Sequence, residues 1–254
     1  MNLNNLTKSK NPMLSDKAIG KASTVDRKAN SGPVIRSSNT MTVSGAVNKT
    51  LVLVLILLCV TLFSYQAPSQ VFMTVGALGG AGVYFLTSFK PTLAPYTAPV
   101  YAALKGLLVG SISAVYAAQY GGIVFQAVSL TIATLLMMLI IHKSGLIPVT
   151  KKFRMAVSMA VGAIMIVYLI SWVGHFVGFT VPFIHDSGPI GIGITVVIIG
   201  VAALNLLLDF DSFEKGEETQ APKYMEWYFS MGLLFTLVWL YIEFLRLLGK
   251  LQRD

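Results

Sequence analysis

Seven long runs of apolar residues, separated by short polar stretches, dominate the chain beyond about residue 46. Each run has close to the ~20 residues that a helix needs to cross a hydrocarbon layer of roughly 30 Å. Lipid offers no partners to backbone polar groups, and the runs lack the alternation of a β-barrel, so we expect helices. The pattern predicts an all-α integral membrane protein with seven transmembrane helices. The predicted spans are approximately 48–66, 70–88, 98–119, 121–142, 155–178, 188–210 and 225–248.

Residues 1–46 are different, because they are rich in Ser, Asn, Thr and Lys and show no apolar periodicity. A segment of this composition cannot bury enough apolar surface to offset the entropy of the chain. We therefore expect a disordered tail over 1–46 and a seven-helix membrane domain over 47–254. The composition agrees, with 55% hydrophobic and only 12% charged residues and a mean hydropathy of +0.71.

Basic residues indicate the orientation of the spans, since loops rich in Lys and Arg stay in the cytoplasm. They lie in the tail and in the second, fourth and sixth loops, which places the N terminus in the cytoplasm. The loop residues are Lys90, Lys143, Lys151, Lys152, Arg154, Lys215 and Lys223. Seven crossings would put Lys250 and Arg253 outside, against this rule, unless one segment is re-entrant and only six cross. The net charge of +8 is thus a topology signal and does not predict a nucleic-acid partner.

A few charged residues lie inside the predicted spans, where each costs a few kcal/mol on insertion scales. Lys105 lies within the third span, and either extends to the cytoplasmic face or serves as a counter-charge to a buried acid. Glu243 and Arg246 are three residues apart in the last span, a spacing that predicts a local ion pair on one helix.

Acids cluster where the sixth span ends and the seventh begins, in NLLLDFDSFEKGEETQAPKYMEW. Asp209 and Asp211 end the sixth span, Glu226 begins the seventh, and a loop of about 14 residues, with EKG as a helix stop, joins them. Residues two apart on a helix point about 200° away from each other, so only one of the two aspartates can face the bundle interior with Glu226. The other is expected to meet water or headgroups.

Two carboxylates held close in a poorly hydrated setting cannot both ionise at low cost, so the pair takes up a proton and titrates as a unit. When both are ionised, their oxygens suit a divalent cation such as calcium. The sequence therefore predicts a proton sensor that binds calcium transiently. The alternative is that these acids are solvated charges at a helix end.

Several long segments of the chain resemble the bacterial branch of the transmembrane Bax inhibitor motif family. They include LAPYTAPVYAALKGLLVGSIS, FIHDSGPIGIGITVVIIGVAALNLLLDFDSFEKG and APKYMEWYFSMGLLFTLVWLYIEFLRLL, and the short NPML at 11–14 also matches. The resemblance covers all seven spans. It implies a seven-helix bundle with a central last helix, and a pH-sensitive calcium leak gated by acids on the sixth and seventh helices.

The resemblance also implies roles for particular residues. FDS at 210–212 favours Asp211 over Asp209 as the sixth-helix acid, and YMEW at 224–227 matches the seventh-helix acid with Glu226. The chain departs from the family pattern in having Glu at this position and in having Lys105 where an acid is expected. A lysine facing the acids would lower their proton affinity and compete with calcium.

Together these features predict a pH-sensitive calcium or cation leak in the bacterial inner membrane, with Asp211 and Glu226 as gate and transient calcium ligands, Asp209 in reserve and Lys105 as a counter-charge. The expected partners are the lipid bilayer and calcium ions, with no cofactor. A non-transporting regulator that binds membrane proteins, such as a quality-control protease, is the alternative. A proton-coupled carrier ranks below it. We do not expect an enzyme, since the sequence offers no HExxH motif and no nucleophile with a placed base.

Overall fold

The computed structural model describes residues 39–177 and 188–252, and seven of its helices are long and apolar enough to cross a membrane. This confirms the prediction of an all-α, seven-span membrane protein. In chain order the helices are α2 (Val43–Gln66), α3 (Gln70–Phe89), α4 (Ala94–Gln119), α5 (Ile123–Ser144), α6 (Lys151–Val177), α7 (Pro189–Glu218) and α8 (Met225–Leu251), with a short 3-10 helix η3 (Pro91–Leu93) before α4.

The expected tail, residues 1–46, lies largely outside the described residues. A compact unit begins at Met41, which is 1% exposed, and α2 begins at Val43, four residues before the expected domain boundary. Thr42 caps this helix, because its side chain accepts a hydrogen bond from the backbone N–H of Gly45 at 2.9 Å.

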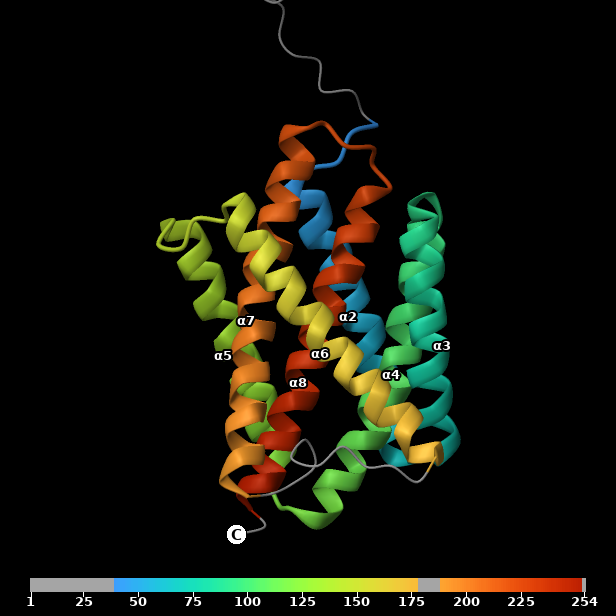
Figure 1. The fold of residues 1–254 in the computed structure, drawn as a ribbon. Helices are drawn as coiled ribbons and strands as arrows, with labels where there is room; N and C mark the ends of the chain where they lie inside the picture. Colours follow the sequence, from blue (N-terminus) through green and yellow to red (C-terminus); the bar gives the residue numbers. More distant parts are fainter. Residues whose placement is uncertain (1–38, 178–187, 253–254) are drawn as a thin grey trace, which may run out of the picture. The chain divides into compact units, whose positions relative to one another are not determined.

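The connections α3–α4, α5–α6 and α7–α8 lie at the same end of this unit as the start of α2 (Figure 1). We call this the loop end. The basic loop residues that the sequence analysis used to predict orientation all lie at this end. The three connections follow the second, fourth and sixth spans, so an even number of crossings separates each of them from the start of α2.

Helix α7 differs most from its prediction. It continues for about two turns beyond the expected end at residue 210 and ends at Glu218. The EKG motif is helical. Gly216 supports this continuation, since the absence of a side chain there lets Met41 and Phe229 pack against the α7 backbone. The connection to α8 is therefore only 219–224, and the expected 14-residue loop was wrong.

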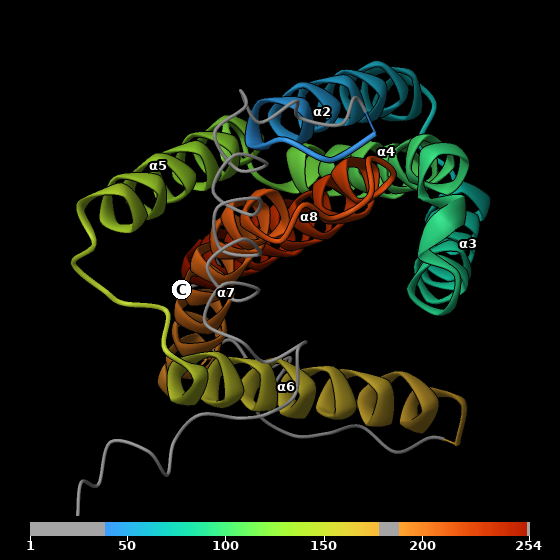
Figure 2. The same cartoon turned by 90° about the horizontal axis from the view of Figure 1, so that it is seen from above.

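Helix α8 lies at the centre of the bundle and is the most buried of the seven spans. It packs against α2, α4, α5 and α7, and the view along the bundle shows it between α2 and α4 on one side and α7 on the other (Figure 2). Helices α3 and α6 pack mainly on α4 and α7 and reach α8 through side chains, as in the stacking of Tyr84 on Phe235 with ring centroids 5.0 Å apart.

Small residues allow close helix crossings in α4. Gly106 and Gly110 meet the α2 backbone at Leu57 and Thr61, and Gly76 of α3 meets the α4 backbone at Leu104. Without a hydrophobic driving force between helices in lipid, such contacts supply much of the association energy. These glycines of α3 and α4 thus serve packing.

Replacing Gly110 by alanine is expected to destabilise the protein by about 1–3 kcal/mol, because the new methyl group would overlap the carbonyl oxygen of Thr61. Thermal unfolding in detergent measures the effect. Gly162→Ala is the matched control, since its methyl group would meet nothing within 4 Å. Equal unfolding temperatures for the two variants would contradict the role of close α2–α4 contact.

Lys250 is a buried helix residue and not part of a solvated tail, because α8 continues to Leu251. Its Nζ donates hydrogen bonds to the carbonyl oxygen of Gly191 at 2.9 Å and to Thr195 Oγ1 at 3.1 Å, both on α7. This residue therefore joins the end of α8 to the start of α7. Arg253, the other basic residue in conflict with the charge rule, lies outside the described residues.

Candidate functional site: carboxylates between the last two helices

Asp209 lies on α7 and faces α8 within the membrane-spanning part of the bundle. Thr236 Oγ1 of α8 donates a hydrogen bond of 2.7 Å to Asp209 Oδ2, and Asn205 Nδ2 lies 3.4 Å from the same oxygen. Asn205 also donates to Thr236 Oγ1 at 2.9 Å. Among the described residues, no cationic side chain forms an ion pair with Asp209, so its charge is met only by neutral donors.

The Asp209 side chain lines a cavity of about 200 Å³ between α3, α7 and α8. The lining consists of Tyr84, Ser88, Asp209, Ser212, Tyr228, Phe229, Met231 and Gly232. Ser88 is exposed and stands one residue before the end of α3, so the cavity extends from Asp209 toward the loop end. Its polar groups are one carboxylate and several hydroxyls. Oxygen donors of this kind suit protons, water and hard cations.

Asp211 points away from α8, as its two-residue separation from Asp209 requires. Its carboxylate pairs with Arg154 of α6 and with Lys215, one turn further along α7, at 2.7 Å. The Asp211 side chain is only 14% exposed, whereas the two cations are 37% and 50% exposed. Asp211 therefore fastens α6 to α7 near the loop end.

Glu226 lies one residue inside the start of α8 and is 3% exposed. Its Oε1 accepts a hydrogen bond from the backbone N–H of Thr42 at 3.1 Å, and the carboxylate rests directly on Gly45. Glu217 Oε2 of α7 accepts a second bond from the Val43 N–H at 3.3 Å. Two carboxylates thus meet the amino end of α2, where unpaired N–H groups and the helix dipole favour negative charge.

The structure does not bring Asp211 and Glu226 together. Three contacts fix the antiparallel register of α7 and α8: Thr195 with Lys250, Asp209 with Thr236, and Gly216 with Phe229. In this register Glu226 is level with position 219, eight residues beyond Asp211, or about 12 Å along the helix. Calcium bridging these two carboxylates would require α7 and α8 to change register or separate.

Lys105 contacts no carboxylate in the described part of the chain. Its side chain runs back along α4, with Nζ 5.6 Å from the centre of the Tyr101 ring, and packs against Gly80 of α3. This direction leads toward the loop end, as expected for a lysine that extends toward a membrane face. The contacts fit that reading better than a counter-charge to the acids.

The predicted pair of Glu243 and Arg246 is confirmed, with Arg246 NH1 3.3 Å from Glu243 Oε1. No sequence pattern indicated the third member of this cluster, Tyr168 of α6, which donates to Glu243 at 2.7 Å and accepts from Arg246 at 2.8 Å. Glu243 is 1% exposed. This cluster and Asp211 are two polar attachments of α6 to the helices beside it.

The fold and these contacts define a multi-pass membrane protein with carboxylates at the interfaces of its last two helices. The family described as Bax inhibitor 1 like matches residues 11–253, and the chain belongs to this family. No curated protein and no solved structure matches the chain significantly.

Proposed function

We propose that the protein is a passive, pH-sensitive leak for calcium and other cations in the inner membrane of a bacterium, with the loop end in the cytoplasm. The gate is the interface of α7 and α8, and Asp209 is its proton-responsive group. The observation that carries the proposal is a carboxylate between α7 and α8 that lines a cavity and has no cationic partner among the described residues. Membership of the Bax inhibitor 1 like family supports it.

Asp209 responds to protons because its charged form is poorly stabilised in the closed bundle. The other titratable groups that line the cavity are the phenols of Tyr84 and Tyr228, and neither brings a positive charge to the carboxylate. Asp209 contacts only neutral donors, so no positive charge nearby balances its ionised form. Loss of the proton would favour a conformation in which water or a cation reaches Asp209, and that conformation conducts.

Asp211 and Glu226 have separate roles in this mechanism. Asp211 holds α6 to α7 through Arg154, and Glu226 holds α8 to the amino end of α2. Both contacts stabilise the closed arrangement at the loop end. When the gate opens, each carboxylate can leave its partner and offer oxygen ligands to an entering calcium ion.

Calcium flux into liposomes loaded with a calcium dye tests the proposal. We expect wild-type flux to rise with pH, as Asp209 loses its proton. Asp209→Asn mimics the protonated side chain and is expected to lower flux at alkaline pH by about tenfold or more, because it removes the charge whose burial disfavours the closed state. Its flux should no longer depend on pH.

Glu218→Gln is the matched control, since Glu218 is an exposed carboxylate at the end of the same helix. It should retain the wild-type pH dependence. Wild-type flux equal to that of protein-free liposomes at every pH would exclude a leak and favour the regulator alternative. An unchanged pH dependence in Asp209→Asn would remove Asp209 from the mechanism.

A further inference from the structure

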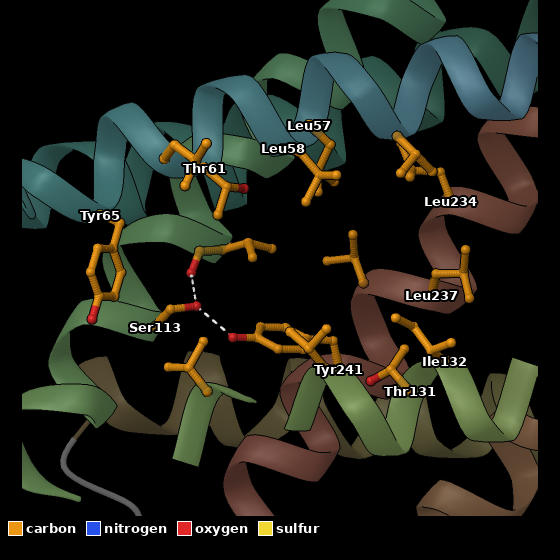
Figure 3. Close-up of a pocket in the computed structure, with 16 residues that line it drawn as sticks. Leu57, Leu58, Thr61, Tyr65, Ser113, Thr131, Ile132, Leu234, Leu237 and Tyr241 are labelled. Carbon is orange, nitrogen blue, oxygen red and sulfur yellow. Dashed lines mark hydrogen bonds between the residues drawn. The ribbon is translucent and has the colours of Figure 1, made fainter. Parts of the chain in front are cut away.

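A second cavity, of about 330 Å³, lies between α2 and α5 with α4 and α8 as its floor (Figure 3). It shares no lining residue with the Asp209 cavity. Its floor is made of buried side chains, including Leu234, Val238 and Tyr241 of α8. Its two rims are exposed, with Leu58 on α2 and Val128 on α5. The cavity is therefore a groove that opens sideways, continuous with the outer faces of α2 and α5.

The hydroxyl groups along the floor of the groove are satisfied within the protein. Ser113 Oγ and Tyr241 OH are 2.6 Å apart, as the dashed line in Figure 3 shows, and Ser113 also bonds to the carbonyl oxygen of Val109. Thr131 donates to the carbonyl oxygen of Ala127, one turn earlier in its own helix. Apart from the exposed Tyr65 at its end, the groove therefore presents an apolar surface whose hydroxyl groups are hydrogen-bonded within the protein.

The length of the groove along α2 matches the thickness of one leaflet of a bilayer. It runs along α2 from Val54, near the middle of this span, to Tyr65, one residue before the helix ends. Eleven residues of helix are about 16 Å, close to half of the roughly 30 Å hydrocarbon layer. Tyr65 is 41% exposed at the position where aromatic residues meet the membrane interface.

We propose that this groove binds one acyl chain of a membrane lipid from the leaflet in which α2 ends. The ester region of the lipid lies beside Tyr65, and the end of the chain reaches Leu234. The exposed apolar side chains at both rims belong to helices that can span the membrane, so a lipid chain is the occupant that the surroundings of the groove would supply.

The bound chain contacts the face of α8 opposite to the Asp209 contact. Thr236, which holds Asp209, is two residues from both Leu234 and Val238 and so points about 200° away from each. The bound acyl chain thus packs on the side of α8 that faces away from α7. This binding site does not depend on whether the protein conducts ions.

Photolabelling in liposomes tests the site, using two phosphatidylcholine probes that carry a diazirine either at the end of one acyl chain or next to its ester. We expect the first probe to label the peptide around Leu234 and the second to label the peptides around Tyr65 and Val124, which also lines the groove. Labelling of the groove should exceed labelling of exposed Met155 and Met159 on α6 several-fold.

Leu58→Trp is expected to fill the groove and reduce its labelling several-fold, and Val128→Trp should do the same from the α5 rim. Leu55→Trp is the matched control, since Leu55 is 61% exposed on the same helix and lies outside the groove lining. Thermal unfolding identifies which variants are folded. Three results would each overturn the proposal. The first is labelling spread evenly over the exposed faces, and the second is equal labelling in the Leu55→Trp control and in folded Leu58→Trp or Val128→Trp. The third is a crosslink from the groove to a second protein chain.

Discussion

Gly45→Ala is expected to raise calcium flux at acidic pH, where the wild-type protein is closed. A methyl group at residue 45 would occupy the space of the Glu226 carboxylate. The flexible carboxylate must move away, so the hydrogen bond that it accepts from Thr42 is lost while the fold is retained. Hydrogen bonds to charged groups contribute about 1.5–3 kcal/mol. The closed state should therefore be disfavoured by about 10- to 100-fold.

Calcium flux in liposomes at several pH values measures this effect, and Gly82→Ala is the matched control. It adds the same methyl group to a transmembrane helix, but meets nothing within 4 Å. Glu226→Ala should resemble Gly45→Ala, because it removes the same contact from the other side. If flux equals that of the wild type in Gly45→Ala but is higher in Glu226→Ala, the methyl group fails to displace the carboxylate. Wild-type flux in both would contradict the role of this contact in closure.

Thr236→Val is expected to shift the pH dependence of flux toward higher pH by about one unit. The Thr236 hydroxyl donates to Asp209 and stabilises its ionised form, so valine, of the same shape, makes loss of the proton harder. Loss of a hydrogen bond to a charged group, at the lower end of the range of about 1.5–3 kcal/mol, corresponds to a shift of about one pH unit. The flux midpoint from a series of buffered liposomes measures this shift.

Thr236→Ser is the control for this prediction, because serine keeps the hydroxyl and loses only a methyl group. It should retain a midpoint close to that of the wild type. A midpoint in Thr236→Val that is unchanged, or displaced toward acidic pH, would contradict an open state that requires the ionised Asp209.

The seven spans were predictable from the sequence, because apolar length is the main requirement for a transmembrane helix. The pairing of acids was not, because it depends on the register between α7 and α8. Because α7 continues through Gly216, the connection between the two helices is 219–224 and is shorter than the predicted 14 residues. This short connection sets the register. Met41, which packs on Gly216, is far away in the sequence, so no local pattern indicated the continuation.

The geometry of the helix did predict that Asp209 and Asp211 would face opposite ways, but not which one faces α8. In the structure Asp209 contacts Thr236 of α8, and Asp211 contacts Arg154 of α6. Both partners are far from the aspartates in the sequence. A threonine within an apolar span carries no signal of its own. Such partners become visible only when the packing of the helices is known.

Infrared difference spectroscopy between acidic and alkaline pH, on protein reconstituted in lipid, tests the central claim most directly. We expect a carboxylic-acid C=O band from Asp209 at acidic pH that disappears over the same pH range in which calcium flux rises. The band should be absent in Asp209→Asn and present in Glu218→Gln. An Asp209 that is ionised throughout this range, or that stays protonated while flux rises, would contradict a gate controlled by its proton.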